Sequence, residues 1–388
     1  MHKHIEMNTR NPFIVSGIIP DEYFCDRQEE TQRLVQQIVG RSTNILLMAN
    51  RRIGKTGLIN HCYCQSQLKE NFYTFYFDIL HTSSLQEFVY EFGKEVYSRL
   101  MPQGQKVLMS LAQSIRSLNP KFSLDPLSGL PSFSLEIGNV TQPEYTLDEI
   151  FSWLEQADKP CIVSIDEFQR IGSYPEKNIE ALLRGKIQNM QNCHFIFSGS
   201  QAHLLGDMFQ SNKRAFYNSA TIMRLDAIDI AKYRAFTQYW FKNGGRQIAD
   251  NAFDALYSYF DGNTFCLQNI LHEAYDAIEP GEECTIETLK QCTNNILEVA
   301  SYGYREALSR LTTKQKAVLT AIAVEKRVEK ITSSAFIHTH HLESASMIQT
   351  ALRILKDQEW VTVQDKTYSV SDPFFALWLR QSVGMSRR

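Results

Sequence analysis

Short hydrophobic runs recur through the first 230 residues of the chain, separated by stretches whose apolar residues follow a helical spacing. Strands of a parallel sheet are buried on both faces by helices, so they appear in a sequence as continuous apolar runs. The pattern predicts an α/β domain with a parallel sheet and helices on both faces. The expected strands are Asn44–Met48, Phe72–Asp78, Cys161–Ile165, His194–Ser198 and Thr221–Leu225.

An insertion at about 100–142 interrupts this pattern between the second and third strands. Met101–Asn119 have helical periodicity, and two alternating stretches follow, joined by the Pro- and Gly-containing segment Asp125–Pro131. This arrangement predicts a helix and a hairpin, which we expect to serve as a lid or as a partner surface. The apolar positions of the hairpin are Phe122 and Leu124 in one arm, and Phe133, Leu135 and Ile137 in the other.

Two further domains are expected after the sheet. From Asp226 to Arg310 there is no strand-like run, and apolar residues recur at helical spacing. From Leu311 three helical segments precede a tight hairpin with arms at Trp360–Val363 and Thr367–Val370. This order favours a winged helix. We therefore expect an α/β core at 1–225, a helical lid domain at 226–310 and a winged-helix domain at 311–388.

A candidate phosphate-binding loop follows the first expected strand. Gly54, Lys55 and Thr56 match the end of the pattern G-x-x-x-x-G-K-[ST], but Ala49 replaces the first glycine and allows fewer backbone conformations at that bend. Such a loop directs backbone N–H groups, a helix N-terminus, a cation and a metal-binding hydroxyl at a polyphosphate. The predicted ATP-binding residues are Ala49, Asn50, Arg51, Arg52, Ile53, Gly54, Lys55, Thr56 and Gly57.

An acidic pair, Asp166 and Glu167, ends the third expected strand. The carboxyl ends of parallel strands face the ligand crevice, so the pair is expected beside Thr56. Asp166 and Thr56 would hold Mg²⁺, and Glu167 would position and deprotonate the attacking water. The alternative is a solvated turn. The second carboxylate favours hydrolysis over transfer to another substrate. An additional strand, ending at Asp78, falls between the loop and the pair, as expected for ATPases whose sheet has an inserted central strand.

Two more polar residues are candidates for catalysis. Ser200 follows the fourth expected strand, where its hydroxyl would sense the γ-phosphate or the attacking water, and the alternative is a cap on the next helix. Arg214 lies in the loop before the fifth strand and is the best candidate to neutralise charge in the transition state. Its alternative is a solvated arginine. With these, the predicted catalytic residues are Lys55, Glu167, Ser200 and Arg214.

Composition narrows the class of protein only slightly. The chain has 388 residues, 43% of them hydrophobic, and a formal net charge of -3, which is typical of a globular protein and indicates no partner class. Its eight cysteines form no C-x-x-C pair, and we interpret them as reduced thiols. No apolar run has the length of a membrane span or of a signal sequence, so we expect a cytoplasmic protein without a membrane role.

Taken together, these motifs resemble the archaeal-type ATPases of the STAND group of signal-transduction NTPases, within the AAA-like P-loop class. The resemblance covers nearly the whole chain. It implies an ATP-dependent switch, in which a nucleotide held between core, lid and winged helix controls a protein partner. The matching motifs are Asn11-Pro12-Phe13, Phe24 to Glu29, Arg51 to Thr56, Ile165 to Phe168, Phe197 to Ser200, Leu311 to Gln315 and Asp372 to Trp378.

The resemblance also implies that residues from Phe24 to Arg27 lie near the adenine, so Arg27 joins the predicted ATP-binding residues. The chain departs from the family at two places. Gly262-Asn-Thr264 stands where relatives have Gly-x-Pro in the lid, and Tyr217-Asn218-Ser219 stands where they have Tyr-Gly-Arg. The identity of the arginine finger and of the lid sensor is therefore open.

A winged helix also raises the alternative of an ATP-responsive DNA-binding regulator with little turnover. The expected reading helix, Ser344–Gln358, would present Ser346, Gln349, Thr350 and Arg353 outward. Residues 311–388 contain eleven Lys and Arg against seven Asp and Glu, but this helix has just Arg353 and Lys356 to contact phosphates. A regulatory domain packed on the ATPase is the competing interpretation. The sequence leaves open whether the chain acts as a monomer or an oligomer.

Overall fold

The computed structural model describes residues 11–41, 43–100, 121–124, 131–134, 140–364 and 366–386. Contacts within the chain divide it into two compact units. One unit contains Arg27–Asn50 and Gly54–Asp226, and the other contains the chain before Arg27, the short segment Arg51–Ile53 and everything from Ala227 onward. The domain boundaries expected at 225/226 and 310/311 stay a prediction.

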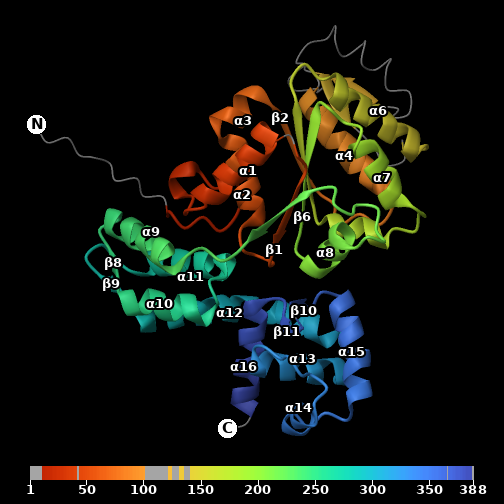
Figure 1. Cartoon of the computed structure of the whole chain (residues 1–388). Coiled ribbons are helices and arrows are strands. Elements are labelled where there is room, and N and C mark those ends of the chain that lie inside the picture. The colour runs from red at the N-terminus through yellow and green to blue at the C-terminus, as the bar shows by residue number, and fades with distance from the viewer. Residues whose placement is uncertain are drawn as a thin grey trace, which may run out of the picture. The chain divides into compact units, whose positions relative to one another are not determined.

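The first unit is built on a five-stranded parallel sheet, visible edge-on in Figure 1. The strand order is β2-β5-β6-β1-β7. All five expected strands are present, with ends that differ by at most one residue, so the predicted α/β fold with a parallel sheet is confirmed. Their bounds are β1 Ile45–Ala49, β2 Tyr73–Asp78, β5 Cys161–Asp166, β6 Cys193–Gly199 and β7 Thr221–Leu225.

Helices cover both faces of this sheet. In Figure 1, α1, α2 and α3 lie on one face, and α4, α6 and α7 lie on the other. The helices are α1 Gln28–Arg41, α2 Lys55–Cys64, α3 Ser66–Asn71, α4 Leu85–Leu100, α6 Pro143–Gln156, α7 Ile179–Ile187 and α8 Ala202–Gln210, with a 3₁₀ helix, η3, at Phe168–Ser173. The amphipathic α4 buries Phe88, Val89 and Phe92 against the sheet, where Phe92 stacks on Phe77 of β2.

One detail of the sheet differs from the expectation. The strand that ends at Asp78 lies at the edge of the sheet, and the strand inserted between β1 and β5 is β6. Chain order alone does not determine which strand takes the central position, because crossovers can carry a strand to either side. As a result the carboxyl ends of β1, β6 and β5 are neighbours.

The expected hairpin is present in the insertion. Strands β3 (Lys121–Leu124) and β4 (Pro131–Ser134) pair antiparallel, with Phe122 opposite Phe133. The helix predicted at Met101–Asn119, the joining turn and the positions of Leu135 and Ile137 lie outside the described residues.

Helices α9 to α12 of the second unit share an apolar core. Phe13, fully buried, packs in this core against Phe241 and Tyr275. The expectation of no strand between 226 and 310 is wrong in one respect, because two short strands, too brief to give a periodic signal, pair in parallel. The elements are α9 Ile230–Asn243, β8 Gln247–Ile248, α10 Asp250–Tyr259, α11 Thr264–Ala277, β9 Glu283–Cys284 and α12 Ile286–Ser309; a short 3₁₀ helix, η1 (Asp21–Tyr23), lies earlier in the same unit.

The winged helix follows α12 with its own core. Its elements are α13 Thr313–Glu325, α14 Ser334–Thr339, α15 Ala345–Asp357, β10 Val361–Gln364, β11 Thr367–Val370 and α16 Pro373–Ser386. The last helix was not anticipated. Buried residues of α15 include Ile348, Ala351, Leu352 and Leu355. The outward-facing positions expected on this helix, Ser346, Gln349, Thr350 and Arg353, are all exposed.

Among the helices of the described residues, none is long and apolar enough to cross a membrane.

Candidate functional site

The loop between β1 and α2 has the geometry of an anion site. Gly54 precedes α2 with a φ of 96°, a left-handed conformation that favours glycine. The helix begins at Lys55, and Gly54 before it has no side chain that could cap the N–H groups at this positive helix end. Ala49 is the last residue of β1, paired with Leu225. The positive φ angles of the loop fall on Arg52 and Gly54 instead, which explains how an alanine fits at position 49.

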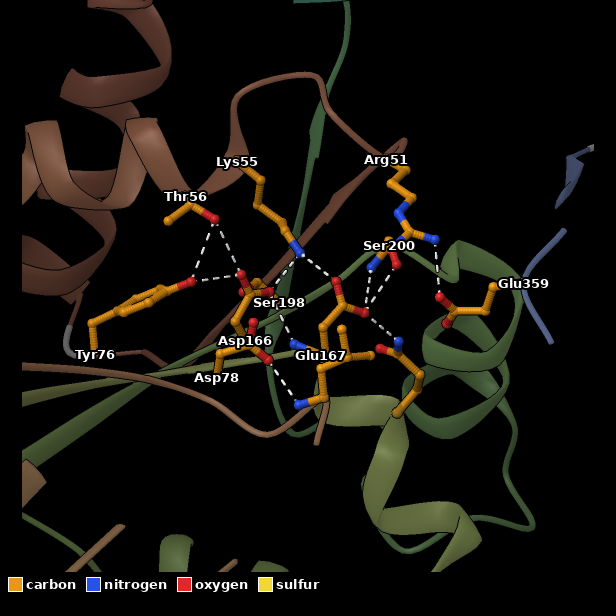
Figure 2. A network of polar contacts seen from close by, with 12 residues as sticks. Arg51, Lys55, Thr56, Tyr76, Asp78, Asp166, Glu167, Ser198, Ser200 and Glu359 are labelled. Atoms are coloured by element: carbon orange, nitrogen blue, oxygen red, sulfur yellow. Dashed lines mark hydrogen bonds and ion pairs between the residues drawn. The ribbon is translucent and has the colours of Figure 1, made fainter. Parts of the chain in front are cut away.

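Lys55 joins this loop to the acidic pair, as Figure 2 shows. Its Nζ lies 2.5 Å from Asp166 Oδ1 and 3.4 Å from Glu167 Oε1. All three side chains are largely buried. A solvated turn at the end of β5 would leave the carboxylates in water, so the geometry favours the site interpretation. In the structure the lysine therefore compensates the negative charge of two carboxylates.

Asp166 is held by donors on both oxygens. Oδ1 accepts from Lys55 and, at 2.8 Å, from the hydroxyl of Ser198, while Oδ2 accepts from Tyr76 at 2.8 Å and from Thr56 at 3.2 Å. Burial by itself would raise the pKa of Asp166, but the Lys55 charge and these hydrogen bonds hold it below its ordinary value. Asp166 therefore stays ionised.

Glu167 has a left-handed backbone with a φ of 56°, which turns its side chain toward the end of β6. Its Oε2 accepts from Gln169 Nε2 at 2.5 Å, from Ser200 Oγ at 2.9 Å and from Ser200 N at 3.2 Å. The hydroxyl of Ser200 is thus directed at Glu167. The N-cap residue of α8 is Gln201, not Ser200. The capping alternative for Ser200 is not supported.

Three residues of the site were not among the predicted ones. They are Ser198 in β6, Tyr76 in β2 and Gln169 in η3. Gln169 lies so close to β6 that a Cβ on Gly199 would stand 2.1 Å from its Oε1. The glycine at the end of β6 is therefore what allows the amide to reach Glu167. Burial, followed by the charge of Asp166, raises the pKa of Tyr76, which stays a neutral donor.

Two predicted residues lie elsewhere. The Arg214 guanidinium pairs with the carboxylates of Glu180 and Asp207, so in this structure it is bound within its own region and not directed at Lys55. Arg27 is buried, with its guanidinium donating to Glu30 at 2.7 Å and to the backbone oxygen of Asp226 at 2.7 Å. Their predicted roles, as arginine finger and adenine neighbour, stay predictions.

Arg51 and Arg52, at the tip of the loop, group with the second unit. Within that unit Phe265 N donates to the Arg52 oxygen at 3.2 Å, and the Arg52 guanidinium lies 4.3 Å from the centre of the Phe265 ring. Two ion pairs of 2.9 Å join Arg51 to Glu359 and Arg52 to Asp372. Residues of α11 and of the winged helix therefore hold the tip of the loop.

The oxygens at the loop fit a magnesium ion that is shared with a nucleotide. Thr56 and Asp166 together offer one hydroxyl and one carboxylate, a set that suits Mg²⁺ when phosphates and water supply the other ligands. No cluster of three or more His, Cys, Asp or Glu suited to hold a metal by itself occurs in the described parts of the chain.

Two family models match the chain. Residues 24–270, more than half of the chain, match the family described as "ATPase domain predominantly from Archaea". Residues 302–381 match a "probable winged helix domain". No curated protein is similar enough in sequence to match the chain.

Solved structures of similar fold cover nearly the whole chain. A Walker-type ATPase of Pyrococcus abyssi is 20% identical with a TM-score of 0.61, and the match covers 95% of this chain and 99% of that one. The ORC2 protein of Aeropyrum pernix, in ADPNP and ADP complexes, is 13% identical with a TM-score of 0.58, and 97% of each chain is covered. The ORC1 protein of Aeropyrum pernix, in complex with DNA, is 14% identical with a TM-score of 0.52 and covers 97% of this chain and 98% of that one. With the parallel sheet, the loop at Lys55 and the winged helix, these matches lead to one conclusion: the chain belongs to the family of ATPase domains found predominantly in Archaea, and it has a C-terminal winged helix.

Proposed function

We propose that this protein binds ATP with Mg²⁺ at the loop around Lys55, hydrolyses it, and uses the bound nucleotide as a switch that controls a protein partner. The observation that carries the proposal is the position of the Lys55 ammonium, 2.5 Å from Asp166 and 3.4 Å from Glu167. A mobile cation, a metal-binding carboxylate and a second carboxylate at one point are what phosphoryl transfer to water requires.

Each side chain has a role in this reaction. Lys55 exchanges its carboxylate partners for the phosphates of ATP. Thr56 and Asp166 would hold the magnesium ion, which would neutralise charge on the phosphates. Glu167, directed by Gln169 and Ser200, accepts the proton of the attacking water. The products are ADP and inorganic phosphate.

The switch is supported by the tip of the loop. Arg52 is bound to Phe265 of α11 and to Asp372 of the winged helix, so a change of loop conformation on nucleotide binding alters contacts of the second unit. Such a switch is the behaviour that the resemblance to the STAND group implies. Phosphate release from the purified protein tests the enzymatic part, measured beside the Lys55→Ala and Glu167→Gln variants. Equal rates in all three would remove the proposal.

Substitution of Gly199 tests whether Gln169 directs Glu167. In Gly199→Ala the new Cβ would lie 2.1 Å from Gln169 Oε1 and 2.9 Å from Leu205 Cδ1, so the amide must move away from Glu167. Because small misplacements of catalytic groups are costly, we expect phosphate release to slow by about 10- to 100-fold with unchanged ATP affinity. An assay of released phosphate measures the rate, and equilibrium binding of ATP measures the affinity.

Gly206→Ala is the matched control. Gly206 lies in α8, and a Cβ there would be 3.8 Å from Met48 Cε, an ordinary van der Waals contact. This variant should hydrolyse ATP like the wild type. A Gly199→Ala protein with the wild-type rate would show that Gln169 does not direct Glu167.

A second candidate function is DNA binding by the winged helix. It is favoured by the exposed polar face of α15 and by the similarity in fold to ORC1, whose structure contains DNA. Here ATP would bind and regulate, with little turnover. We expect duplex DNA to bind at low salt, more weakly as salt rises, and about tenfold more weakly in Arg353→Ala.

Arg310→Ala is the control for charge alone, because Arg310 is exposed, pairs with Glu306 and lies outside α15. Fluorescence anisotropy with a labelled duplex measures all three proteins. No binding of the wild type at low salt would exclude this second candidate.

A further inference from the structure

The hydroxyl of Tyr76 lies at the oxygen of Asp166 that Lys55 leaves open. Tyr76 Oη is 2.8 Å from Asp166 Oδ2 and 3.4 Å from Thr56 Oγ1, and Thr56 Oγ1 is 3.2 Å from the same Oδ2. Figure 2 shows the three groups converging from β2, α2 and β5. The two side chains proposed to hold magnesium thus share a third neighbour.

The register of the sheet explains how a tyrosine reaches this point. Strands β2 and β5 pair in parallel, with Tyr76 opposite Ser164 and Asp78 opposite Asp166. Tyr76 and Asp166 are therefore two positions apart along the strands, a distance that a long aromatic side chain can span on one face of the sheet. On the opposite face of β2, Phe75 and Phe77 are in the core.

Two hydrogen bonds occupy the two acceptor positions of Asp166 Oδ2. A carboxylate oxygen accepts two hydrogen bonds. The shorter bond comes from Tyr76, and the longer one comes from Thr56, which is the proposed magnesium ligand. If Tyr76 keeps its bond when the metal arrives, the carboxylate stays oriented and the direction now used by Thr56 becomes available to the cation.

We propose that Tyr76 is a positioning residue of the magnesium site, and that it holds Oδ2 of Asp166 toward Thr56 so that the divalent cation of the nucleotide complex binds tightly. The inference rests on the proposed binding of ATP with Mg²⁺. Groups that hold a metal ligand in place from outside the metal's own shell typically contribute about 10- to 100-fold to metal affinity.

Tyr76→Phe tests the inference because it removes one hydroxyl and keeps the ring. The probe is Mn²⁺ in place of Mg²⁺, titrated into the full-length protein with ADP, with the free ion followed by electron paramagnetic resonance. We expect the variant to bind Mn²⁺ about 10- to 100-fold more weakly. Binding of ADP in EDTA, where no metal is present, should be unchanged.

The same strand provides a matched control. Tyr73, at the other end of β2, donates its hydroxyl to a carboxylate oxygen of Asp158 at 3.0 Å. Tyr73→Phe therefore removes a tyrosine–aspartate hydrogen bond without touching the site, and it should bind Mn²⁺ like the wild type. Equal Mn²⁺ affinity in Tyr76→Phe and the wild type would overturn the inference.

Two other outcomes are distinct from this one. If Tyr76→Phe lost ADP affinity in EDTA by the same factor, the hydroxyl would support the fold of the site and not the metal, which also overturns the inference. If the wild type with ADP took up no Mn²⁺ at all, the proposed function would fail, and the inference with it.

Discussion

Glu167→Gln should bind ATP as tightly as the wild type and release phosphate about 10²- to 10⁴-fold more slowly. The amide has the shape of the carboxylate, and its oxygen can still accept from Ser200 and Gln169, while Lys55 keeps its shorter contact with Asp166. What it loses is the ability to take a proton from water. Phosphate release under saturating ATP, together with equilibrium binding of ATP, measures the two properties separately.

The control for this variant is Glu155→Gln. Glu155 accepts from the backbone N–H groups of Gln191 and Asn192, just before β6 begins, at the opposite end of the sheet from Lys55. It should hydrolyse ATP at the wild-type rate. If Glu167→Gln also retained that rate, Glu167 would not be the base, and its contacts with Gln169 and Ser200 would need another explanation.

The residues of this site that could be predicted are those whose role follows from the sequence of a single strand or helix. A buried apolar run followed at once by two acids indicates a strand that ends at a ligand crevice, and Asp166 lies there beside Thr56. Likewise Gly54 and Lys55 mark a turn into a helix without reference to the rest of the chain. These predictions needed only local physics.

Contacts that depend on register or on crossovers were not predictable in the same way. A tyrosine within a β-branched and aromatic run indicates a strand, so nothing local marks Tyr76 as a partner of Asp166. Gln169 reaches Glu167 because Gly199 of another strand leaves room. The loop position of Arg214 favours a catalytic role, but its guanidinium pairs with Glu180 of α7, 34 residues away in the chain, and with Asp207 of α8, 7 residues away. Side-chain partners across elements require the fold.

Two family motifs gain a physical reason from the structure. In Leu311-Thr-Thr-Lys-Gln315, Thr312 and Gln315 form a capping box that begins α13. In the motif that starts at Asp372, one carboxylate oxygen accepts from the backbone of Phe374 and Phe375, and the other pairs with Arg52. The first motif stabilises a helix end, whereas the second also joins the winged helix to the tip of the loop.

Lys55→Ala should lose ATP affinity by about 30-fold or more, which corresponds to the 2 kcal/mol or more that truncation of a buried charged partner costs. The Lys55 ammonium, at the start of α2, is the side chain proposed to contact the phosphates. Its removal also leaves Asp166 and Glu167 facing each other without the cation that lies between them. Isothermal titration calorimetry with ATP measures the first effect.

The same variant has a second signature, in the pH dependence of stability. In the wild type the lowered pKa of Asp166 means that its ionised form stabilises the fold. That contribution is fully present above the ordinary carboxyl value near 3.8 and is lost as the pH falls through the lower folded-state value. Without Lys55 the contribution disappears, so Lys55→Ala should be less stable than the wild type by about 3 kcal/mol at neutral pH.

Urea unfolding of both proteins at neutral pH and in acid checks this, because the difference in free energy of unfolding should shrink once Asp166 is protonated in both. Lys94→Ala is the control, since Lys94 is exposed and 4.0 Å from Glu91, and a surface pair of this kind contributes little. A difference for Lys55→Ala that stays constant with pH would mean that the ammonium acts through packing alone. If the difference in free energy of unfolding stayed constant with pH and ATP affinity were retained, Lys55 would have neither proposed role, as partner of Asp166 or as ligand of the phosphates.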